Sequence, residues 1–171
     1  MAGQLIQVAT ETVTSPTATV DLIGTTTDDV YMVTGNNIVV DTDASQWNLR
    51  VLKSSIADTT ANYDYAYKQI RTVLSFHDGV VTNATVYGGT TLGTAGNEDG
   101  NFLLYLFNFN SSSEYSFVTF EETSRSSGAR LDGAQGGFVH TVASASNGIQ
   151  ISCAAGTNNF TSGTFTLYRV V

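Results

Sequence analysis

The sequence predicts an all-β fold, an antiparallel and jelly-roll-like β-sandwich. Segments of alternating or β-branched apolar residues recur at intervals of about ten to fifteen positions, and Gly, Asn, Asp and Ser separate them. Thr is frequent, and it suits a pleated, half-buried surface while forming helices poorly. A length of 171 residues fits one core of this kind. We therefore expect a single β-sandwich domain over residues 1–171, with little room for helices.

The first half of the chain supplies a series of predicted strands. Four short apolar segments open it, at residues 4–8, 18–23, 30–34 and 38–40. The intervening Gly35-Asn36-Asn37 is typical of a hairpin connection or a bulge. Trp47, Leu49 and Val51 then alternate with polar residues, which places these core candidates on one face of a strand. Residues 63–76 fit either a strand or a short helical face, and their strand neighbours favour a strand.

A hairpin is the strongest pattern in the second half. Two apolar runs, 102–109 and 115–120, flank Asn110-Ser111-Ser112-Ser113-Glu114, residues that favour turns through local side-chain to backbone hydrogen bonds. Two segments rich in Gly or Ser, 88–100 and 124–137, are predicted to be long surface loops. The predicted closing strands cover residues 137–144, 148–153 and 163–171.

Charge argues against several classes of partner. The formal net charge is −8, and the seven Lys and Arg residues form no cluster. Nucleic-acid affinity comes mainly from Lys and Arg that displace counterions from phosphates, so we expect no nucleic-acid partner. The same composition disfavours an anionic membrane surface, and no apolar run approaches the roughly 18 residues that a spanning helix needs. The N-terminus lacks the pattern of a secretory signal, so we expect a soluble protein made in the cytoplasm.

Candidate catalytic groups are few. His77 precedes a turn-like Asp-Gly pair, His140 lies within a predicted strand, and neither belongs to a recognised catalytic motif. Glu121 and Glu122 are adjacent and should point to opposite faces of a strand. Asp41-Thr42-Asp43 begins like a calcium loop but lacks the Gly and Glu that complete one, so solvated turn carboxylates are favoured over a structural calcium ion. We predict no catalytic residue, no cofactor and no metal site.

Two other features have ordinary structural explanations. Cys153 lies in an apolar stretch, which is typical of a buried small hydrophobe more than of a reactive thiol. The run Tyr63-Asp64-Tyr65-Ala66-Tyr67 suits two roles, cross-strand core packing or a surface platform for a carbohydrate or a partner protein. Core packing is the favoured interpretation of this run.

Near the C-terminus, several short motifs follow one another in an order that resembles the C-terminal sequence of a known protein family. Asn147-Gly148-Ile149 precedes a turn rich in Gly and Asn at 155–160, and Ser162-Gly163 is followed at a fixed distance by Leu167-Tyr168. This order resembles the ending of many small bacteriophage virion structural proteins, which close with N-G-I, a Gly-Asn turn and S-G-x-x-x-L-Y-G. Arg169 stands where the final Gly is usual.

Further pieces of the chain resemble the same family. Residues 62–66 are similar to its tyrosine-rich strand, and residues 107–112 to its Asn-Pro-Ser hairpin, with Phe109 in place of Pro. The resemblance implies a virion component with a jelly-roll-like sandwich and no enzymatic activity. It implies structural roles for the motif positions, which are Asn147, Gly148, Ile149, Gly163, Leu167 and Tyr168.

Two functional hypotheses follow from the resemblance. The first is a capsid decoration or accessory head protein whose partners are other virion proteins, either major capsid or tail proteins, and further copies of itself, with a homotrimer expected by analogy. The second is a tail-fibre or knob module that binds a host-surface glycan. The chain shows no heptads, collagen-like triplets or β-helix repeats that would form a fibre shaft, which favours the first. Low charge and abundant Thr, Ser, Asn and Gly agree with a surface covered by neighbouring subunits.

Overall fold

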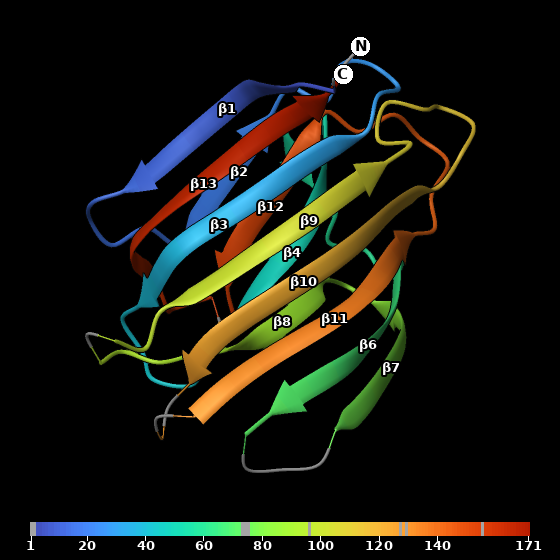
Figure 1. Cartoon of the computed structure of the whole chain (residues 1–171). Coiled ribbons are helices and arrows are strands. Elements are labelled where there is room, and N and C mark those ends of the chain that lie inside the picture. The colour runs from blue at the N-terminus through green and yellow to red at the C-terminus, as the bar shows by residue number, and fades with distance from the viewer. Residues whose placement is uncertain (1–2, 73–75, 96, 127, 129, 155) are drawn as a thin grey trace.

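The computed structural model describes residues 3–72, 76–95, 97–126, 128, 130–154 and 156–171, which form two antiparallel sheets packed as a sandwich (Figure 1). The large sheet has the order β1-β13-β3-β9-β10-β11-β6-β7, and the small sheet the order β2-β12-β4-β5, with β8 also paired to β4. The predicted fold class is confirmed, and no described residue is helical. The strands are β1 (Leu5–Val13), β2 (Thr19–Ile23), β3 (Tyr31–Val40), β4 (Ser45–Lys53), β5 (Ile56–Ala57), β6 (Tyr63–Arg71), β7 (His77–Ala84), β8 (Tyr87–Leu92), β9 (Gly100–Phe107), β10 (Ser116–Ser126), β11 (Arg130–His140), β12 (Gly148–Cys153) and β13 (Phe160–Val170).

Eight of these strands have jelly-roll connectivity. In that topology a long antiparallel hairpin is wrapped up, so that the first strand pairs with the eighth, the second with the seventh, and so on inward. Here β1 pairs with β13, β2 with β12, β3 with β9 and β4 with β8. The strands β5–β7 and β10–β11 are insertions into this plan. As Figure 1 shows, β10, β11, β6 and β7 extend the large sheet beyond β9.

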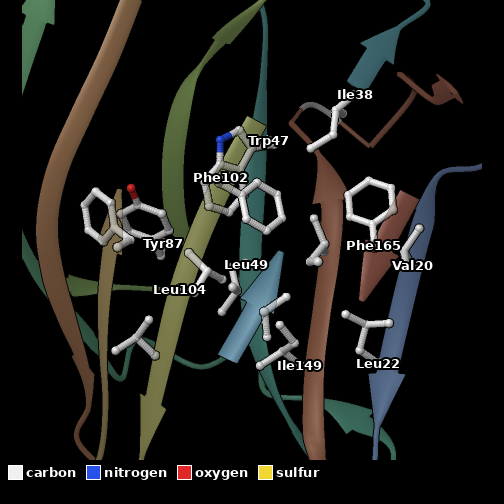
Figure 2. Packing of buried hydrophobic residues seen from close by; sticks show 14 of the residues in the cluster. Val20, Leu22, Ile38, Trp47, Leu49, Tyr87, Phe102, Leu104, Ile149 and Phe165 are labelled. Carbon is white, nitrogen blue, oxygen red and sulfur yellow. The ribbon is translucent and has the colours of Figure 1, made fainter. Parts of the chain in front are cut away.

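The alternation of side chains builds one core between the sheets. Trp47 of β4 stacks on Phe102 of β9, with ring centroids 4.6 Å apart, and Tyr87 of β8 meets the indole edge-on at 5.5 Å. Figure 2 shows this contact and, beside it, aliphatic side chains such as Leu49 and Ile149 of the small sheet packed against the large one. Each fully buried Phe or Leu side chain contributes about 1.5–3 kcal/mol, so a core of this kind dominates the stability.

Most of the predicted strands are present, and several are longer than expected. The predicted hairpin is confirmed as β9 and β10, which pair antiparallel. Of the two alternatives at Gly35-Asn36-Asn37, the bulge is correct, because β3 is one strand whose register with β9 shifts between Gly35 and Ile38. Asn37 has a φ of 53°, which agrees with a local irregularity inside a continuous strand.

Three predictions of loops or turns are wrong. The expected surface loop 124–137 is largely the end of β10 and most of β11, the expected loop 88–100 begins inside β8, and the turn expected after His77 is the start of β7. These strands carry Gly, Ser or Asn on one or both faces, so they lack the alternation of apolar residues that marks a half-buried strand. Residues 73–75, 96, 127, 129 and 155, which fall within predicted segments, lie outside the described residues.

Candidate functional site

A polar cleft lies where the large sheet extends past the small one. The inner face of β6 and β7 faces β8 there, and the cleft between them has a volume of about 390 Å³. Its walls carry amide, guanidinium, imidazole and aromatic groups, including Gln46, Tyr67, Gln69, Arg71, Phe76 and His77. The placement follows from register, because Gln69 of β6 lies opposite His77 of β7, so both side chains point to the same face of the sheet.

Glu122 of β10 forms the inner end of the cleft. Its side chain points inward, as expected from the alternation with Phe120, and only 5% of the residue is exposed. The carboxylate accepts hydrogen bonds from Trp47 Nε1 at 2.6 Å, from the Thr90 backbone N–H at 3.1 Å to each oxygen, and from the Tyr87 hydroxyl at 3.4 Å. Glu122 therefore ties β10 of the large sheet to β4 and β8 of the small one.

Burial dominates the electrostatics of this carboxyl group. It raises the pKa of Glu122 to about 7, although the hydrogen bonds from Thr90, Trp47 and Tyr87 act in the opposite direction. Among the described residues no Lys, Arg or His lies within ion-pair distance of Glu122. Burial, and then the charge of Glu122, raises the pKa of Tyr87 well above its ordinary value. The hydroxyl of Tyr87 therefore stays protonated near neutral pH.

A second buried acid anchors two side chains of the cleft wall. Asp132 of β11 is fully buried, and its Oδ1 accepts hydrogen bonds from Arg71 Nε at 2.7 Å and from Gln69 Nε2 at 3.0 Å. Both donors come from β6, which pairs with β11. Asp132 thus holds the guanidinium and amide groups in place and compensates the charge of Arg71.

A separate polar cluster lies at the other end of β6 and β11. The Asp58 carboxylate is 2.9 Å from His140 Nε2 and 3.1 Å from Lys53 Nζ, and the Asp58 side chain is only 8% exposed. Burial works against the charged form, yet the hydrogen bonds from Thr60, His140 and Lys53 outweigh it and hold the pKa of Asp58 well below its usual range. Burial lowers the pKa of His140, so its imidazole is neutral and donates from Nε2. This cluster fixes the chain between β5 and β6 onto the end of β11.

The outer face of the large sheet carries a row of uncharged residues, one from each of its eight strands. The strand registers place these residues side by side across the whole sheet. We call them the uncharged row; in strand order they are Gln7, Tyr168, Met32, Tyr105, Thr119, Gly137, Ala66 and Val80. Phe107, Phe117 and Val139 form a parallel apolar row beside it. Charged residues flank the uncharged row on both sides: Asp64 lies beyond Val139 at the end of the apolar row, and Glu121, Lys68 and Asp78 lie on the other side.

The residues predicted from the phage-like motif occupy structural positions and do not converge on a site. Asn147 links three segments: its carbonyl accepts from the Gly24 N–H at 2.8 Å, its N–H donates to Leu52 O at 2.9 Å, and its side-chain Oδ1 accepts from the Ser55 N–H at 3.0 Å. Ile149 and Leu167 are fully buried in the core. Gly148 starts β12, and Tyr168 lies half-buried in the uncharged row.

The backbone conformation at position 163 explains why a glycine occurs there. Its φ is 139°, a value that side-chain-bearing residues rarely adopt, and it lies where the pairing of β13 with β3 shifts register. The bulge lets β13 continue from Phe160 into the segment that carries Phe165 and Leu167 into the core.

The acidic pair and the two histidines occupy separate places in the fold. Glu121 is exposed and Glu122 buried, which confirms that the pair points to opposite faces. His77 lines the cleft, whereas His140 belongs to the Asp58 cluster. These histidines align with β6 positions six residues apart, or about 20 Å along the strand, so they do not form a pair. Within the described residues, no group of three or more His, Cys, Asp or Glu side chains is placed to hold a metal ion.

Cys153 lies in the core, whereas the tyrosine run lies only partly in the core. Cys153 is buried, and burial followed by the charge of Asp41 raises the pKa of its thiol to about 12, as expected for a small core residue. In the tyrosine run, Tyr63 is fully buried and its hydroxyl bonds the backbone of Val51 and Asp58, which confirms the core role. Tyr67 is only partly buried and lines the cleft, so for this residue the alternative of a surface platform stays a prediction.

In the part of the chain that the structure describes, no helix is long and apolar enough to cross a membrane. Comparison of the chain with protein-family models, with curated proteins and with solved structures finds no match.

Proposed function

We propose that this chain is a non-enzymatic bacteriophage virion structural protein, a capsid decoration or accessory head protein that associates with other virion proteins and with copies of itself. The observation that carries the proposal is the uncharged row, which crosses all eight strands of one sheet face. The phage-like C-terminal motif supplies the virion context.

The composition of the uncharged row suits a protein interface. Charged residues are depleted and Tyr and Met are enriched in the buried centres of interfaces, and the row contains Tyr105, Tyr168 and Met32 but no charge. Phe117 of the neighbouring apolar row is 45% exposed, and Val80 at the end of the uncharged row is 77% exposed. Contiguous exposed apolar surface of this kind marks contact sites. Association of identical faces in a closed symmetric group would cover it, and a homotrimer is the expected group.

The polar groups of the interior support a structural role. Glu122 is held by Trp47, Tyr87 and Thr90 between the two sheets, and Asp58 is held by His140, Lys53 and Thr60. Each acid is thus committed to joining strands. We propose no catalytic nucleophile and no acid-base pair.

A second candidate function is a tail-fibre or knob module that binds a host-surface glycan. The observation in its favour is the polar cleft, where amide and guanidinium groups meet the exposed ring of Phe76 and the partly buried ring of Tyr67. Saturable binding to host cells that free surface glycan abolishes would favour this candidate over decoration.

A charge placed in the uncharged row tests the first proposal. Thr119 lies near the middle of the row and Thr19 on the opposite sheet, and both side chains are exposed. We expect Thr119→Lys to abolish self-association and binding to particles stripped of this protein, because one desolvated, unpaired charge is costly in an interface. Thr19→Lys should behave as the wild type. Light scattering at tens of micromolar and co-sedimentation with particles measure the two effects.

The salt response provides a further check on the same proposal. Contacts through an uncharged face should persist in about 1 M salt, where charges are screened beyond about 3 Å. A wild-type protein that stays monomeric and ignores stripped particles would contradict the proposal, and so would equal binding by the two lysine variants.

A further inference from the structure

The polar cleft beside Glu122 has its own chemistry, which the uncharged row does not explain. It opens between β8 and the inner face of β6 and β7, whereas the row lies on the outer face of the same sheet. A ligand site at the cleft is therefore independent of the proposed assembly surface, and either can fail without the other.

A buried carboxylate holds two planar polar side chains of the cleft wall in place. Gln69 and Arg71 each donate to the same oxygen of the fully buried Asp132, at 3.0 and 2.7 Å. Within the described residues, the terminal guanidinium nitrogens of Arg71 and the Oε1 atom of Gln69 make no further hydrogen bond. These atoms line a cavity while their side chains are already ordered, so a ligand that used them would gain hydrogen bonds at little cost in side-chain entropy.

The charge balance selects a neutral ligand. Arg71 is a cation of the cleft wall, and the buried Asp132 behind it compensates that charge. At the rim, Lys68 Nζ lies 5.8 Å from the centroid of the Phe76 ring and pairs with Asp78 at 3.7 Å, so a ligand that stacks on this ring would use its other face. The nearest remaining acid, Glu122, is satisfied by four hydrogen-bond contacts from Trp47, Tyr87 and Thr90. The cleft thus offers many donors and acceptors but no uncompensated positive charge for an anion. Within the described residues it also lacks the three acidic or histidine ligands that a metal ion requires.

Aromatic rings complete the set of groups. Phe76 is 68% exposed at the rim, and the partly buried Tyr67 lines the wall. A pyranose ring presents C–H bonds on its faces and hydroxyl groups around its edge, so it uses an aromatic ring and planar polar side chains together. A cavity of about 390 Å³ accommodates one or two such rings.

We propose that the cleft lined by Gln46, Tyr67, Gln69, Arg71, Phe76 and His77 binds an uncharged sugar residue, with Phe76 stacking on the ring and the amide and guanidinium groups bonding its hydroxyls. This inference extends the second candidate function by naming the site and the ligand class. It is also compatible with a decoration protein that carries a sugar-binding face.

The single tryptophan supplies a built-in reporter. Trp47 donates its indole N–H to Glu122 Oε2 at 2.6 Å, and Glu122 lines the cleft. Gly89 forms part of the wall directly over the indole, where any side chain would overlap the ring. A sugar that enters the cleft therefore changes the surroundings of the only Trp in the chain. The backbone amides of Gly88 to Thr91 give a second, direct signal by NMR.

The experiment titrates the full chain with glucose, galactose, mannose and N-acetylglucosamine, each to about 50 mM, and follows Trp47 fluorescence and the Gly88 to Thr91 amide shifts. We expect saturation by at least one of them with a Kd on the order of 1 mM, typical of a small ligand that makes a few hydrogen bonds. Phe76→Ala and Gln46→Ala should each weaken binding about fivefold or more. Tyr115→Ala and Gln4→Ala, exposed residues outside both the cleft and the uncharged row, are the matched controls and should leave the Kd unchanged.

Three results would overturn the proposal. The first is no saturable response to any neutral sugar. The second is binding that the Phe76 and Gln46 variants leave intact, because the sugar would then occupy another place. The third is a response to inorganic phosphate or N-acetylneuraminic acid alone, which would make the cleft an anion site centred on Arg71. None of these results bears on whether the uncharged row mediates assembly.

Discussion

At the scale of single residues, Glu122 is a buried acid whose ionisation is coupled to folding between acidic and neutral pH. Burial raises its pKa from the ordinary 4.5 to about 7 in the folded protein. As pH rises above 4.5, the unfolded chain releases this proton before the folded one does, so ionisation favours unfolding. The stability contributed by the protonated form is complete below about pH 4.5 and is lost as pH approaches 7. The difference amounts to about 3 kcal/mol.

Replacing this carboxyl group should remove its pH dependence. We expect the stability of wild type relative to Glu122→Gln to fall by about 3 kcal/mol between pH 4.5 and pH 8, because the amide does not titrate. Urea unfolding at the two pH values measures the change. The adjacent Glu121 is exposed, so Glu121→Gln is the matched control and should keep the wild-type pH profile. Identical pH profiles for wild type and Glu122→Gln would show that the carboxyl is not held at a raised pKa.

Asp58 and His140 have the opposite pH response, which is why the Glu122 effect has to be measured as a difference between variants. The lowered pKa of Asp58 makes its contribution disappear as pH falls through its folded pKa. The lowered pKa of His140 means that protonation below its ordinary value of 6.5 opposes folding. Both residues destabilise the fold toward acidic pH, and both are common to wild type and Glu122→Gln.

At the scale of elements, the Asp58 cluster shows how the connection from β5 to β6 is held. Asp58 accepts from Lys53 of β4, from His140 at the end of β11, and from Thr60 within the connection. We expect Asp58→Ala to destabilise the fold by about 3–5 kcal/mol, because it leaves the partly buried Lys53 and the fully buried His140 without their partner. Asp78→Ala, which removes a 77% exposed side chain from a surface ion pair with Lys68, should change stability by less than about 1 kcal/mol.

Thermal or urea unfolding of the two alanine variants provides the measurement. Equal effects would mean that the Asp58 cluster is no more important than a surface pair. A large loss in Asp58→Ala with native-like far-UV circular dichroism would place the damage in the packing of the β5–β6 connection, with the sheets preserved.

The elements that could be predicted are those with one buried and one exposed face. Alternation in β4, β9 and the start of β10 predicts strands that the structure contains. The last three residues of β10, most of β11 and the start of β7 are predicted as loop or turn, because Ser, Gly and Asn stand there in place of the apolar members of the pattern. Hydrophobic periodicity fails in β10 and β11 because their inward positions there are buried polar residues such as Glu122, Ser124 and Asp132, and it fails in β7 because that strand is largely exposed.

The candidate site was only partly predictable for the same reason. Glu122 continues the inward series of Val118 and Phe120, so its burial could have been inferred from the strand that contains it. Asp132 and His77 could not be placed, because the segments that carry them were predicted as a loop and a turn. Their meeting with Gln69 depends on the pairing of β11 with β6 and of β6 with β7, which is a long-range property that local patterns do not encode.

At the scale of the whole molecule, the jelly roll closes through β13. This strand pairs with β1 on one side and β3 on the other, so it joins the edge of the large sheet to its centre (Figure 1). It also carries Phe165 and Leu167, both fully buried, and Phe165 packs 6.1 Å from Phe102 and 5.3 Å from Phe160 between ring centroids. Removal of β13 therefore takes away core side chains and two strand pairings at once.

We expect deletion of residues 163–171 to give unfolded or insoluble protein. Each of the two buried side chains contributes about 1.5–3 kcal/mol, and a domain of this size has a net stability of roughly 5–15 kcal/mol, so the loss of both, together with two pairings, exceeds what the fold can tolerate. Two double variants of β13 separate the contribution of its core side chains from the contribution of its backbone pairings. The double variant Phe165→Ala with Leu167→Ala should lose most of the stability in urea unfolding, because both side chains face the core. The double variant Thr164→Ala with Tyr168→Ala changes the outer face of the same strand and should unfold close to the wild type. If the inner and outer variants were equally stable, β13 would be peripheral to the core, and the closure of the jelly roll would have to depend on its backbone pairings alone.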